Sequence, residues 1–258
     1  MRGTVIIAAM LLMQAGALCF AGEIPPTERR SGAAFMTPQT QAIQNDDTAN
    51  PAMLSVLDGE KLWKEKSGAA NLACADCHSD PGSMRGVAAH YPAFDTKLGR
   101  PVNLEQRINL CRSERQRATP LAYESPELLA LTALVARQSR GMPIDAGADP
   151  RLAPFVAAGR ELFMRRQGQL NLGCSNCHDD NWDKHLAGSA ITQAHPTGYP
   201  LYRLEWQSIG SLQRRLRNCM AGVRAQAFDY GAPELVELEL YLMSRGRGMA
   251  MDAPAVRP

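Results

Sequence analysis

The sequence predicts a mainly α-helical protein built from two copies of one unit. One observation is a gapless match between residues 58–78 (DGEKLWKEKSGAANLACADCH) and residues 158–178 (AGRELFMRRQGQLNLGCSNCH), both ending in C-x-x-C-H. Another is that two later motifs recur in the same order, LEQRINLC (104–111) as LQRRLRNC (212–219) and SPELLALTALVARQSRGMPI (125–144) as APELVELELYLMSRGRGMAM (232–251). Repeated motifs in a fixed order indicate an internal duplication.

Each copy begins with an amphipathic helix before its C-x-x-C-H motif. Leu62 and Trp63 in the first copy, and Leu162 and Phe163 in the second, lie on the apolar side of that stretch. A loop region rich in Gly and Pro follows each motif. The three histidines outside the motifs have no counterpart in the other copy, and we expect them in loops: His90, His185 and His195.

The next element in each copy is a helix that carries a cysteine. Leu104, Ile108 and Cys111 follow the spacing i, i+4, i+7, as do Leu212, Leu216 and Cys219, so each cysteine falls on the buried face. A last helix starts at Ser125-Pro126 or Ala232-Pro233, with proline in the first turn. Glycines near 141 and 246–248 end it.

These elements divide the chain into five parts. Residues 1–21 combine Arg2, an apolar run and a small residue at Ala21, which is typical of a cleaved secretory signal and predicts a periplasmic protein. No other segment is long and apolar enough to span a membrane. An N-terminal extension (22–52), a first domain (53–144), a linker (145–153) and a second domain (154–258) follow. The net charge of +2 favours neither nucleic acid nor an anionic membrane as a partner.

The two C-x-x-C-H motifs predict two covalently bound haem c groups. In such a motif the two thiols bond to the haem vinyl groups and the histidine binds iron. The first haem would use Cys74, Cys77 and His78, and the second Cys174, Cys177 and His178. Zinc is the competing interpretation, but two copies that each continue into histidine in an exported chain favour haem. The fold class is therefore two repeated cytochrome c-like haem domains in one chain.

The second axial ligand of each iron is less determined by the residues. Cys111 and Cys219 occupy equivalent places, and a thiolate is one possible ligand. Three alternatives stay open: a disulfide between these two cysteines, two inert buried thiols, or ligation by the equivalent methionines Met142 and Met249.

These motifs resemble the SoxA family, the dihaem subunits of the SoxAX complexes of bacterial thiosulfate oxidation. The resemblance rests on both C-x-x-C-H sites, on the later cysteine in each half and on SRGRGM (244–249). It implies His/Cys ligation of both irons, by His78 with Cys111 and by His178 with Cys219. It also implies that the second haem carries the activity and that its cysteine can occur as a persulfide.

The resemblance further implies a reaction and its partners. Thiosulfate would be conjugated oxidatively to a cysteine of a SoxYZ-like carrier, with electrons leaving to a cytochrome acceptor, and a SoxX-like small cytochrome would complete a heterodimer. Cys219 would be the working sulfur. Arg215, one helical turn before it, and Arg247 are the candidates to hold the dianion. Their counterparts Arg107 and Arg140 keep open that these arginines pair with haem propionates instead.

Two other functions compete with this transferase. The chain could be a dihaem electron-transfer cytochrome without chemistry of its own. It could also be a thiosulfate dehydrogenase, which forms tetrathionate without a carrier protein. The three remaining arginines of this region are expected to be solvated charges: Arg214, Arg217 and Arg224.

Overall fold

The computed structural model describes residues 24–258. The signal peptide predicted for residues 1–21 lies outside the described residues. Among the described helices, none has both the length and the apolar character that crossing a bilayer requires. The described chain begins with two short 3-10 helices, Pro26–Glu28 and Gly32–Phe35, and helix α1, Pro38–Asn45.

The first repeat contains four α-helices in the predicted order. They are α2 Ala52–Lys64, α3 Cys74–His78, α4 Leu104–Cys111 and α5 Pro126–Arg137. Helix α5 starts where the sequence predicts, with Ser125 as its N-cap accepting from Leu128 N. A π-helical turn, Arg112–Gln116, continues α4. Between α3 and α4 lie 3-10 helices Pro81–Met84 and Val87–His90 and a hairpin of β1 Ala93–Asp95 and β2 Arg100–Val102.

The second repeat has the same helix order. Its helices are α6 Ala153–Met164, preceded by the 3-10 turn Pro150–Leu152, then α7 Cys174–His178, α8 Leu212–Gly222 and α9 Pro233–Arg245. Strands β3 His185–Leu186 and β4 Ser189–Ala190 form a small hairpin. A larger hairpin of β5 Leu201–Arg203 and β6 Ser208–Gly210 takes the C-terminal strand β7 Ala255–Arg257 as a third strand.

The two long helices of each repeat cross in close contact through a glycine. A side chain at Gly59 of α2 would collide with the carbonyl oxygen of Ala130 on α5, and one at Gly159 of α6 with that of Glu237 on α9. Only glycine lets the two backbones approach this far. The crossing therefore fixes the helix that precedes each C-x-x-C-H motif against the last helix of the same repeat.

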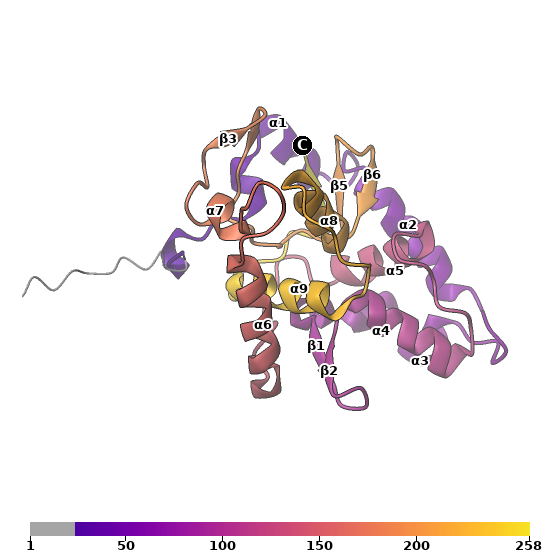
Figure 1. The fold of residues 1–258 in the computed structure, drawn as a ribbon. Helices are drawn as coiled ribbons and strands as arrows, with labels where there is room; N and C mark the ends of the chain where they lie inside the picture. The colour runs from indigo at the N-terminus through magenta and orange to yellow at the C-terminus, as the bar shows by residue number, and fades with distance from the viewer. Residues whose placement is uncertain (1–23) are drawn as a thin grey trace, which may run out of the picture.

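The two repeats share one interior, while their C-x-x-C-H helices lie far apart. Segments 142–144 and 249–251 run antiparallel, with Ile144 N donating to Met249 O (2.9 Å) and Met251 N to Met142 O (2.9 Å). Met243, Met251 and Ala253 of the second repeat belong to the apolar core that fills the first. Helices α3 and α7 stand at opposite ends of the molecule (Figure 1).

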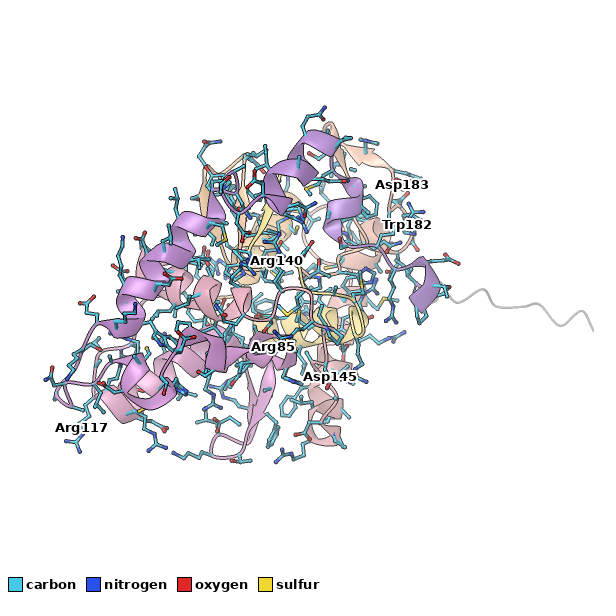
Figure 2. All side chains as sticks on the ribbon, turned by 180° about the vertical axis from the view of Figure 1, so that it is seen from behind. Arg85, Arg117, Arg140, Asp145, Trp182 and Asp183 are labelled. Carbon is cyan, nitrogen blue, oxygen red and sulfur yellow. The ribbon has the colours of Figure 1, made fainter. Side chains whose placement is uncertain are left out.

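The N-terminal extension packs across the second repeat and the C-terminus. Phe35 makes an edge-on contact with Trp182 at 6.5 Å, and the Arg30 guanidinium lies over the same ring; Figure 2 labels Trp182 beside this extension. The side-chain amide of Asn50 donates to Pro254 O (3.1 Å). The extension is thus part of the folded body.

The hairpins are the main difference from the fold predicted by sequence. Their strands are two or three residues long, too short for an alternating pattern to show. Two histidine placements were also wrong: His185 lies in the two-residue strand β3, and His90 is the last residue of a short 3-10 helix. His195 does lie in a loop, buried, with its Nδ1 3.0 Å from Arg30 O.

Candidate functional site

Each C-x-x-C-H motif forms one short helix whose start is capped by the motif itself. In α3 the Asp76 carboxylate accepts from Ala73 N (2.8 Å), and in α7 the Asn176 amide oxygen accepts from Gly173 N (3.0 Å). The variable third residue of each motif therefore satisfies a free backbone N–H group. The helical turn brings both thiols and the histidine of each motif to one site.

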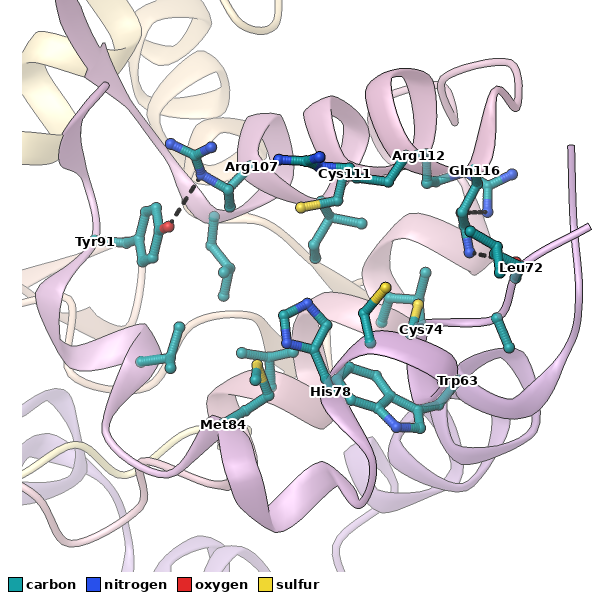
Figure 3. A pocket seen from close by; sticks show the side chains of 18 residues that line it. Trp63, Leu72, Cys74, His78, Met84, Tyr91, Arg107, Cys111, Arg112 and Gln116 are labelled. Atoms are coloured by element: carbon teal, nitrogen blue, oxygen red, sulfur yellow. Dashed lines mark hydrogen bonds between the residues drawn. The ribbon is translucent and has the colours of Figure 1, made fainter. Parts of the chain in front are cut away.

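In the first repeat this site opens on a large apolar cavity of about 570 Å³. His78 and Cys111 point toward each other from opposite walls (Figure 3). That volume lies in the range of roughly 300–1,000 Å³ that is usual for cofactor sites. Three arginines of the lining come from α4 and its π-helical extension: Arg107, Arg112 and Arg115. Most of the other lining residues are apolar, among them Trp63, Leu72, Met84, Val87, Leu104, Ile108, Leu131 and Val135.

In the second repeat the same two residue types come together more closely. His178 Nδ1 lies 2.6 Å from the backbone oxygen of Thr192, which orients the ring and leaves Nε2 as its free nitrogen. The thiol of Cys219, on α8, is hydrogen-bonded with the His178 side chain. Sequence reasoning missed Thr192, because a backbone acceptor leaves no signature in residue type.

The two equivalent cysteines differ in acidity. Burial is the largest single influence on both thiols, and taken alone it would raise the pKa of each. For Cys111 burial prevails over Arg107 and Arg115, and its pKa is raised. For Cys219 the pKa is lowered, because the hydrogen bond with His178 and the positive charges of Arg215 and Arg203 outweigh burial. Since the thiolate is the form that binds metals and attacks sulfur, Cys219 is the better prepared of the two.

The donor sets fit a haem iron. Within residues 24–258 no group of three or more His, Cys, Asp or Glu side chains is placed to hold a metal ion by itself. Each site instead offers one imidazole and one sulfur, and a porphyrin supplies the other four ligands of a six-coordinate iron. Two thiols beside each imidazole suit covalent attachment. His78 with Cys111 and His178 with Cys219 would hold such groups.

Cys219 is surrounded by positive charge. Arg215 forms no ion pair within the described part of the chain, and Arg203, on β5, is close enough to affect both Arg215 and Cys219. The half-buried Tyr199 lies near the same three groups, and desolvation of its phenol raises its pKa to about 12. Arg203 and Tyr199 were not among the predicted site residues. The arrangement places a sulfur nucleophile beside cations that suit an anionic ligand.

Comparisons with known proteins agree with this geometry. The family described as SoxA/TsdA, cytochrome c domain, matches residues 58–144 and 158–251. The chain belongs to the SoxA/TsdA family of c-type cytochromes. Membership implies covalently bound haem c, and the family's cytochrome c domain occurs twice here, as the predicted fold class requires.

Individual relatives are similar over nearly the whole chain. The L-cysteine S-thiosulfotransferase subunit SoxA of Rhodovulum sulfidophilum is 38% identical over 89% of this chain and 80% of its own length. The subunit of the same name from Pseudaminobacter salicylatoxidans is 36% identical over 90% and 82%. The crystal structure of SoxXA from P. pantotrophus superposes with a TM-score of 0.86, at 33% identity, over 89% of this chain and 87% of that chain.

The second predicted arginine, Arg247, lies beside an acidic side chain. Arg247 Nε is 3.9 Å from Asp145 Oδ1, and no ion pair among residues 24–258 links Arg247 to Cys219. Its counterpart Arg140 binds Asp47 (2.8 Å) and the backbone oxygen of Gln44. Arg140 and Asp145 are both labelled on the face shown in Figure 2.

The structure also bears on the alternatives for the second ligand of each iron, namely a disulfide and the two methionines. All six described cysteines are free, so Cys111 and Cys219 form no disulfide. Met142 and Met249 lie in the paired segments between the repeats, and Met142 does not line the first cavity. The methionine that does line it is Met84, which has no counterpart in the second repeat.

Arg245 is a further residue that sequence reasoning missed. It is buried, donates to Asp179 Oδ1 (2.6 Å) directly after His178, and lies over the Phe163 ring. Its counterpart is Gln138, and that of Asp179 is Ser79. A charged pair that replaces a neutral pair at equivalent positions is a signal that the repeat alignment contains. The ion pair ties α9 to the segment that carries His178.

Proposed function

We propose that this chain is the haem-bearing subunit of an L-cysteine S-thiosulfotransferase, acting on thiosulfate in bacterial sulfur oxidation. The observation that carries the proposal is the arrangement of Cys219, which is hydrogen-bonded with His178 and lies within reach of the charge of Arg215, a side chain without an ion pair among residues 24–258. The names of the relatives support it. In this proposal two haem c groups are held by domains 53–144 and 154–258, and the mature protein is periplasmic after loss of residues 1–21.

The proposed reaction joins the outer sulfur of thiosulfate to a cysteine of a carrier protein. One S–S bond forms, the S–H bond of the carrier thiol breaks, and one proton and two electrons leave. Bound haem supplies the acceptor for those electrons, which pass on to a cytochrome. We propose a SoxX-like small cytochrome as the partner in a heterodimer, and a SoxYZ-like protein as the carrier.

Cys219 has the role of the working sulfur. As a thiolate it takes up thiosulfate oxidatively to give Cys219–S–S–SO₃⁻, releasing two electrons. The carrier thiolate then attacks the outer sulfur, which forms the new S–S bond and returns Cys219 as thiolate. Arg215, one helical turn away, holds the sulfonate group through the planar guanidinium. Arg247 remains the second proposed anion ligand, from its position beside Asp145.

The test is thiosulfate-dependent electron flow in a system reconstituted with the small cytochrome and the carrier. Cys219→Ala is expected to abolish it, and Cys111→Ala to leave most of it, because the pKa of the Cys219 thiol is lowered whereas that of Cys111 is raised. Arg215→Ala and Arg247→Ala are expected to weaken it without loss of haem. A pyridine haemochrome assay should find two haems per chain in each variant.

One result would contradict the proposal directly. If Cys219→Ala folded, kept both haems and turned over at the normal rate, the chain would be an electron-transfer cytochrome only. A thiosulfate dehydrogenase is the second candidate, because the matching family covers both SoxA and TsdA. It predicts tetrathionate formation without any carrier protein, which the same assay measures when the carrier is left out.

A further inference from the structure

A charge reversal between the repeats lies beside Cys219. Residues 91–111 (YPAFDTKLGRPVNLEQRINLC) match residues 199–219 (YPLYRLEWQSIGSLQRRLRNC) without gaps. The alignment pairs Arg107 with Arg215, one turn before the cysteine in each half. It also pairs Asp95, at the end of β1, with Arg203, at the end of β5. The same structural position is thus an acid in one half and a base in the other.

In the first repeat the acid neutralises the arginine. Arg107 Nη2 donates to Asp95 Oδ2 at 2.6 Å, and Arg107 Nε donates to the Tyr91 hydroxyl at 3.2 Å. The Asp95 side chain is only 8% exposed. Two backbone N–H groups, of Lys97 and Leu98, also donate to it and hold the carboxylate in place. The charge of Arg107 is therefore used within the chain.

In the second repeat Arg215 has no aspartate at the position of Asp95. A second positive charge, that of Arg203, stands there instead. The Arg203 side chain is 12% exposed, and its Nε is buried without a hydrogen-bond partner in the described part of the chain. Among residues 24–258 the one ion pair of Arg203 is with Glu205 (2.8 Å), a side chain that is 64% exposed and therefore well screened by water. Burial, followed by the charge of Arg215, lowers the pKa of Arg203.

Two half-buried guanidinium groups that are close enough for one to lower the pKa of the other are unfavourable without an anion beside them. A dianion with several oxygens removes this cost, because each guanidinium can donate two parallel hydrogen bonds to it. We propose that Arg203 joins Arg215 in binding the sulfonate end of the thiosulfate dianion at Cys219, and that this second arginine selects dianions over monoanions. The substrate in this inference rests on the proposed function.

The Trp206 ring packs against the guanidinium group of Arg203. The Arg203 guanidinium lies 5.3 Å from the centre of the Trp206 ring, and Arg214 contacts the same ring at 4.3 Å. Arg214, however, points to Ser208 and to Glu124, and it is not among the main influences on the pKa of Cys219. Arg214 is therefore a matched control: the same residue type on the same aromatic ring, outside the anion site.

The experiment measures thiosulfate binding and turnover on the haem-loaded protein. Equilibrium binding of thiosulfate is measured calorimetrically without carrier, and KM and kcat are measured with it, for Arg203→Gln, Arg203→Asp, Arg203→Lys and Arg214→Gln. Loss of one charged hydrogen-bonding partner should weaken binding by about 10- to 100-fold. We expect that loss in Kd and KM for Arg203→Gln, a larger one for Arg203→Asp, partial recovery for Arg203→Lys, and wild-type values for Arg214→Gln.

A second readout separates substrate binding from a structural role. Sulfate, a dianion that cannot react, should inhibit the wild type competitively and lose that effect in Arg203→Asp, where the carboxylate pairs with Arg215 as Asp95 does with Arg107. If Arg203→Gln kept the wild-type Kd while the haem potential shifted, Arg203 would be a propionate partner and the inference would be wrong. Binding without carrier needs no turnover, so a failure of the proposed transfer reaction would leave this result standing.

Discussion

Glu105, buried between the two repeats, gives a prediction about stability and pH. This carboxyl group lies in the first turn of α4 and is 6% exposed. It faces Glu239 of α9, which accepts hydrogen bonds from the side-chain amides of Asn103 (3.1 Å) and Gln213 (3.2 Å). Burial, and then the charge of Glu239, raises the pKa of Glu105 to about 8. Burial also raises the pKa of Glu239, to about 7.

The direction of the pH effect follows from these shifts. Between pH 4.5 and about 8 the folded state holds protons that the unfolded state has released, so stability falls as pH rises. A change in one pKa from 4.5 to about 8 lowers the free energy of unfolding by roughly 4 kcal/mol between pH 5 and pH 9. Glu105→Gln removes that carboxyl group, and glutamine is the residue at the equivalent position 213.

The assay is guanidinium chloride unfolding of the haem-loaded protein at pH 5, 7 and 9, followed by circular dichroism. Glu105→Gln should gain stability over the wild type progressively as pH rises, by roughly 4 kcal/mol from pH 5 to pH 9. Glu127→Gln, in the exposed first turn of α5, is the matched control and should show no such trend. A wild-type-to-variant difference that stayed constant with pH would refute the reasoning.

Two further predictions concern packing and the missed ion pair. Gly59→Ala and Gly159→Ala should each destabilise the protein by roughly 1–3 kcal/mol in thermal or denaturant unfolding, because the added methyl group meets a backbone carbonyl oxygen of the crossing helix. An unchanged unfolding midpoint in either variant would mean that the two helices can move apart without loss of stability. Arg245→Met should cost about 3–5 kcal/mol because it leaves Asp179 buried without its partner. Arg247→Met, at a half-exposed site beside Asp145, should cost under about 1 kcal/mol, and equal losses would contradict this account.

The helical part of the fold could be predicted from the sequence because its signals are local and occur in both repeats. Proline in the first turn of α5 and α9 marked both helix starts, and the i, i+4, i+7 spacing put Cys111 on the cavity side of α4. The hairpins were missed because a three-residue strand carries no period. Their pairing depends instead on contacts such as Tyr202 with Val256, more than fifty residues apart.

Site residues could be predicted where the residue type itself indicates the chemistry. They could not be ranked where their role depends on neighbouring side chains that only the fold brings together. The C-x-x-C-H motifs are typical of haem c attachment, so the sequence alone was enough to predict His78 and His178 as iron ligands. Arg215 and Arg247 could not be ranked, because the two differ in what surrounds them: Tyr199 and Arg203 for one, Asp145 for the other. Arg203 itself became visible only when the hairpin was aligned with its counterpart in the other half.

The strand that carries Arg203 is hydrogen-bonded on both sides. In the first repeat β1 pairs with β2 alone, whereas β5 pairs with β6 and, in parallel, with β7, where Arg203 lies opposite Arg257. Loops normally lose conformational entropy when a ligand orders them, and that loss weakens affinity. Here the last residues of the chain have already restrained the backbone before any anion arrives. The third strand thus preorganises the backbone of Arg203 for the dianion binding that we propose, which would then not require this strand to become ordered first.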